Sequence, residues 1–357
     1  MGSSALGVLF VCVTAAASAQ SSVLLDAMGE ELDRNFSTLK TKADPAPYFL
    51  SYEVTEEDLQ SVSATLGAIT GTGHSKTRRL DVCVRVGAPN LDNYHRVRGE
   101  RTQFTSGALL TFEDQPASIK HKIWLETDRA YKLAAERLIK IRTNAEVKVA
   151  ERDASSDFTR EEPTVSLQTV PHGRMAPDWA ARVRKLSEKF SDYQGILTSS
   201  VTVSYQDETK YFVSTEGSRL RHGRGFARVV VSAQSKAMDG TDLGSGETFE
   251  ATDPAGLPRD EVIAAAVERV AQDLEALLVA PEAEPFACPA IFSGRAAGVF
   301  FHEIFGHRVE GHRQKDEEEG QTFTKSVGGK VLPDFLSVVF DPTRKKIGGV
   351  QLNGSYT

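Results

Sequence analysis

The residues best suited to chemistry lie late in the sequence, where two histidines flank a glutamate. His302 precedes Glu303 directly and His307 follows, inside the apolar, glycine-containing run FFHEIFGHRVEGH that extends from Phe300 to His312. Imidazole nitrogens bind divalent metal ions, and a carboxylate beside such an ion can take a proton from the water that it activates. These residue types therefore predict a metal-dependent hydrolytic site.

The two histidines are five residues apart, and an ordinary α-helix does not bring such a pair onto one face. Four residues return a side chain to within about 40° of its starting direction, whereas five leave it roughly 140° away. The HExxH zinc motif is therefore excluded. Joint ligation needs a widened helix, a break, or a helix that ends before His307, and Gly306 supplies backbone freedom for each of these. A single π turn, with its i→i+5 hydrogen bonds, would bring the two histidine side chains onto one face of the helix.

The segment HEIFGHRVEGHRQKDEEEGQTF, preceded by GRAAGVFF, resembles the HExxxH signature of the TldD/PmbA family of zinc metallopeptidases. The resemblance is dense from Gly294 to Phe323 and much looser over the N-terminal part of the chain. It implies that His302 and His307 are zinc ligands and that Glu303 is the general base of peptide hydrolysis. The alternative for Glu303 is a solvated or ion-paired helix carboxylate.

The chain departs from the family pattern in one respect. Relatives complete the metal site with a cysteine thiolate far downstream, and no cysteine follows Cys288. The sequence therefore resembles a C-terminally truncated member with two histidine ligands, whereas zinc usually takes three from the protein in catalytic sites. We expect weak zinc binding and little or no activity from the chain.

Three features beside the motif could supplement the site. Glu310 agrees with the family pattern, and we expect it to support a ligand imidazole. His312 is interpreted as a surface histidine, with metal ligation as the alternative. The acidic run from Asp316 to Glu319 is typical of a solvated loop.

The resemblance also implies substrates and partners. Peptides or unfolded polypeptide segments are the expected substrates, held as an extra strand. The family forms dimers, so a homodimer or a heterodimer with a related subunit is expected. A non-catalytic dimer partner or peptide-binding module on the same scaffold is the alternative. A structural helix that needs no metal is a third possibility.

Composition and the N-terminal sequence limit the partners and the cellular location that the chain can have. The 357 residues carry a formal net charge of −7, which gives no overall basic field for nucleic acid or anionic membranes. The apolar run from Leu6 to Ala17, with Ala17-Ser18-Ala19 after it, is typical of a signal peptide and too short to span a bilayer. We therefore predict a signal peptide at 1–19 and a periplasmic or secreted protein without a membrane span. Because no Lys or Arg precedes the run, an apolar leader on a cytosolic protein is the alternative.

Apolar periodicity predicts an α+β fold with antiparallel-rich sheets and packed helices. We expect an N-terminal α+β region at 20–284 and the beginning of a β-rich metallopeptidase domain at 285–357. The predicted helices are 24–39, 128–149, 179–190 and 259–279, and the predicted strands are 48–54, 61–70, 79–86, 196–205, 210–215, 225–233 and a buried 286–292. We interpret 71–73 as a hairpin turn and 240–256 as a loop.

Cys83 and Cys288 lie in two of these strand-like runs, where a free cysteine behaves as a small buried hydrophobe. An oxidising compartment would also permit a bridge between them.

Overall fold

The computed structural model describes residues 22–97, 107–147, 156–170, 172–311, 313, 322–341, 343–347 and 350–351. The predicted signal peptide at 1–19 lies outside these residues, as do His312 and the acidic run from Asp316 to Glu319. Within the described part the chain is α+β with a mainly antiparallel sheet, which confirms the predicted fold class.

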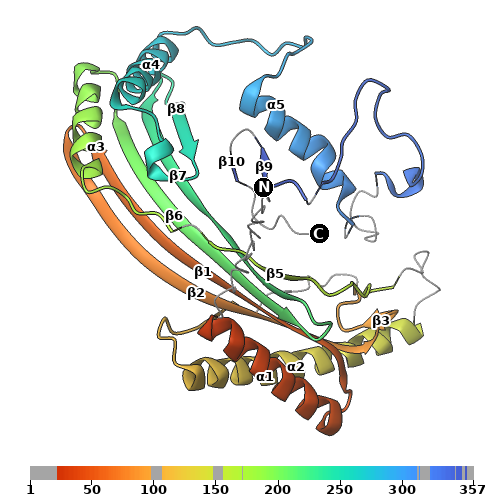
Figure 1. Cartoon of the computed structure of the whole chain (residues 1–357). Coiled ribbons are helices and arrows are strands. Elements are labelled where there is room, and N and C mark those ends of the chain that lie inside the picture. The colour runs from red at the N-terminus through yellow and green to blue at the C-terminus, as the bar shows by residue number, and fades with distance from the viewer. Residues whose placement is uncertain are drawn as a thin grey trace, which may run out of the picture.

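A strongly bent sheet forms the centre of the molecule (Figure 1). Four long antiparallel strands build it, and shorter strands extend it in the order β3-β2-β1-β6-β7-β5, with β4 on β2 and β8 on β7. All pairs in this sheet are antiparallel except that of β5 with β7. The strands are β1 (Pro47–Thr65), β2 (Ala68–Ala88), β3 (Leu91–Asp92), β4 (Ala108–Leu109), β5 (Val165–Leu167), β6 (Thr198–Ser214), β7 (Arg219–Lys236) and β8 (Asp242–Ala251).

The predicted hairpin turn at 71–73 is wrong, because β1 and β2 are joined earlier, by Leu66 and Gly67. Both residues have positive φ, 46° and 79°, as a two-residue hairpin requires. Gly73 lies inside β2 opposite Ser61, and a Cβ there would come 2.9 Å from the Ser61 hydroxyl oxygen. This glycine therefore permits a close cross-strand approach and does not form a turn.

Other predictions for the sheet need correction as well. The predicted strand 61–70 crosses the turn between β1 and β2, because β1 is continuous from Pro47 to Thr65 and β2 begins at Ala68. The predicted strands 196–205 and 210–215 are one continuous strand, β6, whose polar middle makes cross-strand contacts such as that of Gln206 Nε2 with Glu57 Oε1 at 3.2 Å. The predicted loop 240–256 contains β8, which pairs with β7. Residues 286–292 form no strand and are exposed. Cys288 is accordingly exposed, while Cys83 in β2 is partly buried, and both are free thiols.

The helices follow the predicted pattern more closely. They are α1 (Val23–Lys42), α2 (Pro116–Val147), α3 (Trp179–Glu188) and α4 (Asp260–Leu278), and α5 (Gly294–Phe301) leads into the candidate site. Only α2 differs strongly, because it begins at Pro116 and not at the predicted Asp128. Among the described helices, none has the length and apolar character needed to cross a membrane.

Two apolar cores lie on one face of the sheet, at opposite ends of the long strands. In β1, Leu50, Tyr52 and Val54 belong to the core under α1 and α2, whereas Val62 and Ala64 belong to the core under α3 and α4. All five are even-numbered, and side chains two apart in a strand share a face. Helix α5 lies on the other, concave side of the sheet (Figure 1).

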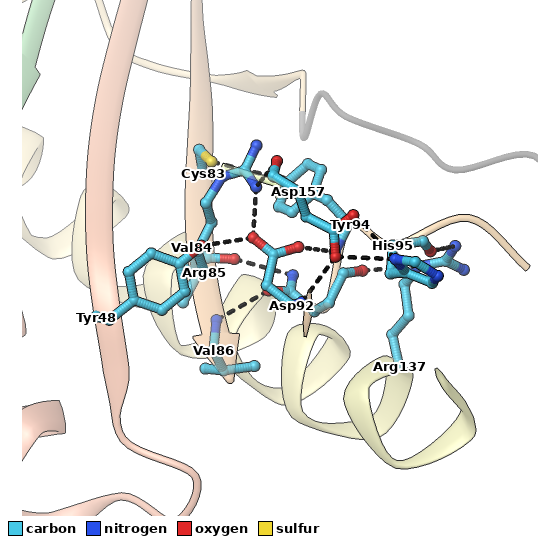
Figure 2. Close-up of polar contacts among 11 residues, drawn as sticks. Tyr48, Cys83, Val84, Arg85, Val86, Asp92, Tyr94, His95, Arg137 and Asp157 are labelled. Atoms are coloured by element: carbon cyan, nitrogen blue, oxygen red, sulfur yellow. Dashed lines mark hydrogen bonds and ion pairs between the residues drawn. The ribbon is translucent and has the colours of Figure 1, made fainter. Parts of the chain in front are cut away.

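A buried polar cluster fastens two loop segments to β2 (Figure 2). The Asp92 side chain is fully buried and forms an ion pair with Arg85, accepts a hydrogen bond from the Tyr48 hydroxyl at 2.6 Å, and accepts another from the Tyr94 amide at 2.7 Å. Burial, and then the Asp92 carboxylate, raise the pKa of Tyr48. The Arg85 guanidinium lies over the rings of Tyr94 and Phe158, 4.2 and 4.7 Å from their centroids.

This cluster generates a stability prediction. Replacing Asp92 with Ala leaves the Arg85 charge unpaired, and breaking a buried pair in this way costs about 3–5 kcal/mol. We expect a drop in melting temperature on the order of 10 °C in a thermal unfolding scan.

The matched control is Asp58→Ala, which removes a partly exposed carboxylate paired with Lys76 at 2.9 Å. Exposed pairs contribute about 1 kcal/mol or less. Equal melting temperatures for the two variants would show that the cluster does not hold the fold in the way described.

Candidate metal centre

The helix that carries the histidines changes its pitch between them. Regular α-helix ends at Phe301, residues His302–Gly306 form a π turn, and a short 3-10 turn covers His307–Val309. The backbone N–H of His307 donates to the carbonyl of His302, which is the i→i+5 bond of a π-helix. The widened helix is therefore the one of the three predicted solutions that the chain adopts.

The π turn places both histidines and the glutamate together. The imidazole centroids of His302 and His307 are 4.3 Å apart and the rings meet at 69°. Glu303 Oε1 lies 4.0 Å from His302 Nε2, and its Oε2 lies 3.9 Å from His307 Nε2. One donor atom from each residue falls within 4.8 Å of the other two, so the three predicted site residues form one candidate metal group.

Aromatic contacts hold the opposite side of this helix. Phe305, inside the π turn, is 8% exposed and stacks on Phe301, with 5.2 Å between ring centroids. Phe323 contacts it from the following loop at 5.7 Å. The His302 and Glu303 side chains are 60% and 62% exposed. The aromatic contacts of Phe305 therefore hold the turn, while the His302 and Glu303 side chains are exposed.

Gly306 does not use the freedom that a glycine offers. Its φ and ψ are −52° and −57°, values that any residue adopts in a helix. A Cβ at this position would lie 3.6 Å from His302 Nδ1, an ordinary contact. The observed backbone therefore does not require a glycine at position 306, although Gly306 was expected to allow the helix to widen. Gly294, the first residue of α5, does have a positive φ of 54°.

Glu310 contacts the second histidine from the next turn. Its Oε1 lies 2.8 Å from His307 Nδ1, so the predicted support of an imidazole is present as a hydrogen bond. The other oxygen, Oε2, forms an ion pair with Arg313 Nε at 3.0 Å. The sequence analysis gave Arg313 no role, although oppositely charged side chains three residues apart can meet on a helical turn.

Few contacts join this segment to the sheet in the described part of the chain. Arg295, in the first turn of α5, donates from Nη2 to the backbone carbonyl of Thr248 in β8 at 3.0 Å. This bond lies on the concave side, where Figure 1 shows α5.

The comparisons with known proteins concern the same segment. Residues 285–353 match the model of the PmbA/TldA metallopeptidase C-terminal domain. No curated protein matches the sequence.

Three solved structures are similar to the chain, and the chain spans about half the length of each. They are a putative modulator of a DNA gyrase from Thermotoga maritima MSB8 (12% identity, 68% of this chain and 47% of that one, TM-score 0.39), TldE from Thermococcus kodakarensis (11%, 70% and 47%, 0.39) and a putative modulator of DNA gyrase from Bacteroides thetaiotaomicron VPI-5482 (10%, 70% and 49%, 0.42).

The matched stretch includes His302, Glu303 and His307 and extends on both sides of the π turn. The family model thus matches the stretch that carries the motif, and this match supports the resemblance of that stretch to the TldD/PmbA family.

Proposed function

We propose that this protein is a zinc-dependent peptidase whose metal is held by His302 and His307. The observation that carries the proposal is the π turn, which directs both imidazoles toward one carboxylate, with Nε2 to oxygen distances of 4.0 and 3.9 Å. Two imidazoles beside a carboxylate are a donor set that suits zinc.

The residues of the site have separate roles in this proposal. His302 and His307 would hold the ion through Nε2, and a zinc ion bound there supplies Lewis acidity toward a peptide carbonyl and toward water. Glu303 would accept a proton from the attacking water and pass it to the leaving amine, since its carboxylate lies beside both Nε2 atoms.

The proposed affinity and activity are low. Among the described residues the candidate group contains two imidazoles and Glu303, whereas catalytic zinc usually has three protein ligands. The His302 and Glu303 side chains are more than half exposed, and exposure to water weakens the electrostatic interactions on which catalysis depends.

The remaining proposals concern substrate, partner and location. Peptides or unfolded segments are the proposed substrates. A dimer with a second copy or with a related subunit is the proposed assembly. The signal-like residues 1–19 support a secreted or periplasmic protein, and the division of the chain near residue 285 stays a proposal as well.

Zinc titration tests the ligand assignment. By isothermal titration calorimetry, we expect the wild-type chain to bind one zinc ion with a dissociation constant above about 1 µM. His302→Ala and His307→Ala should each remove this binding. The control is His172→Ala, which changes an exposed histidine far from the motif in sequence and should leave zinc binding unchanged. Submicromolar binding by the wild type, or unchanged binding by either variant, would contradict the two-ligand site.

Gly306→Ala tests the backbone account. The dihedral angles of Gly306 are helical and the added Cβ makes only an ordinary contact. Alanine is also favoured over glycine inside helices by about 1 kcal/mol. We expect unchanged zinc affinity and an unchanged or raised melting temperature, and a tenfold loss of affinity would show that the site needs glycine there.

Glu303→Gln tests the proposed base. General base catalysis contributes about 10²–10⁴-fold, so cleavage of an unfolded polypeptide at saturating zinc should fall to background in this variant. Zinc affinity, measured in parallel, should persist. Cleavage retained at the wild-type rate would refute the role of Glu303.

A further inference from the structure

A row of three side chains extends from His307 away from the metal group. His307 Nδ1 contacts Glu310 Oε1 at 2.8 Å, and Glu310 Oε2 pairs with Arg313 Nε at 3.0 Å. The backbone N–H of Arg313 also donates to the carbonyl of Glu310 at 3.1 Å, so the turn itself brings the two together. Each carboxylate oxygen of Glu310 therefore has its own cationic or N–H partner.

The first of these contacts determines which nitrogen of His307 is free. An ionised carboxylate only accepts hydrogen bonds, so His307 Nδ1 must be the donor. In a neutral imidazole the other nitrogen, Nε2, then carries the lone pair. That nitrogen is the one that lies 3.9 Å from Glu303 Oε2, on the side of the candidate metal group.

The second contact determines how the carboxylate is presented. Arg313 forms an ion pair with Oε2, without hydrogen-bond geometry at Nε, while Oε1 contacts His307, so the electrostatic attraction favours this orientation of the Glu310 carboxylate. Glu310 and Arg313 are each 34% exposed, which places the pair partly in water and limits its strength. Arg313 should therefore contribute less than Glu310.

We propose that Glu310 is a positioning residue that fixes His307 in its Nδ1–H tautomer, and that Arg313 holds Glu310 in the required orientation. The consequence for metal affinity rests on the proposed zinc site, whereas the tautomer exists in the metal-free chain. A surface pair without this role would leave the tautomer unchanged when it is removed.

Nitrogen-15 NMR of the imidazoles tests the proposal without metal. At about pH 8.5, well above the ordinary pKa of an imidazole, we expect His307 in the wild type to carry its proton on Nδ1. Glu310→Ala should lose this preference, and Glu310→Gln should keep it because the amide oxygen still accepts. Glu282→Ala, an exposed carboxylate outside the motif, is the matched control. An unchanged His307 tautomer in Glu310→Ala overturns the proposal.

Zinc titration of the same variants provides the second measurement. Loss of a partner that orients a metal-binding histidine weakens metal affinity by about 10–100-fold, which we expect for Glu310→Ala, with partial recovery in Glu310→Gln. Arg313→Gln should weaken it only about two- to fivefold, the effect of an exposed ion pair.

The two measurements separate two failures. If the wild type binds no zinc, the proposed function fails, and the tautomer result still decides the role of Glu310. If the wild type and Glu310→Ala bind zinc equally, the positioning role fails and the zinc site stands.

Discussion

The candidate site depends on one backbone hydrogen bond, from the N–H of His307 to the carbonyl of His302. In an α-helix the N–H of a residue bonds the carbonyl four positions back, and side chains five apart point in different directions. The longer i→i+5 bond removes this mismatch and leaves the imidazole centroids 4.3 Å apart. The buried ring of Phe305, which stacks on Phe301, stabilises the same turn through apolar packing.

The rest of the chain provides a rigid support on which such a segment can lie. Four helices cover one face of the sheet and create two separate cores. The Arg85–Asp92 ion pair lies near one end of β2. The face opposite the helices is left on the concave side, where α5 and the π turn lie (Figure 1). The bond from Arg295 to the Thr248 carbonyl connects the first turn of α5 to β8. The sheet thus lies beside the helix that leads to His302, Glu303 and His307, with few contacts between them in the described part of the chain.

Much of the fold could be predicted from the sequence because apolar periodicity reports burial directly. Helices α1, α3 and α4 each pack one apolar stripe on the sheet, and their predicted ranges agree with the observed ones to within a few residues. The errors arise where polar residues or glycines occupy regular structure. Gly73 permits close approach between strands, and the polar middle of β6 is held by cross-strand hydrogen bonds, so neither marks a turn. The predicted strand 286–292 is apolar, but it stays exposed in the described part of the chain, where its Phe292 ring stacks on Phe300 at 4.6 Å between centroids.

The residues of the candidate site could be predicted from the sequence, but their geometry only in part. The five-residue spacing excluded an ordinary helix and gave the π turn as one of three solutions, but hydrogen bonding alone selects among them. The support of His307 by Glu310 was expected from the resemblance to the family, whereas the ion pair of Glu310 with Arg313 was not predicted, although both pairs are three residues apart.

The most direct test of the account is X-ray absorption spectroscopy at the zinc edge of the zinc-loaded chain. The π turn predicts scattering from two imidazole rings in the first coordination shell, reduced to one in either His302→Ala or His307→Ala if any zinc is retained. A spectrum with one imidazole or none in the wild type would contradict the claim that the widened helix turn unites the two histidines in one metal site.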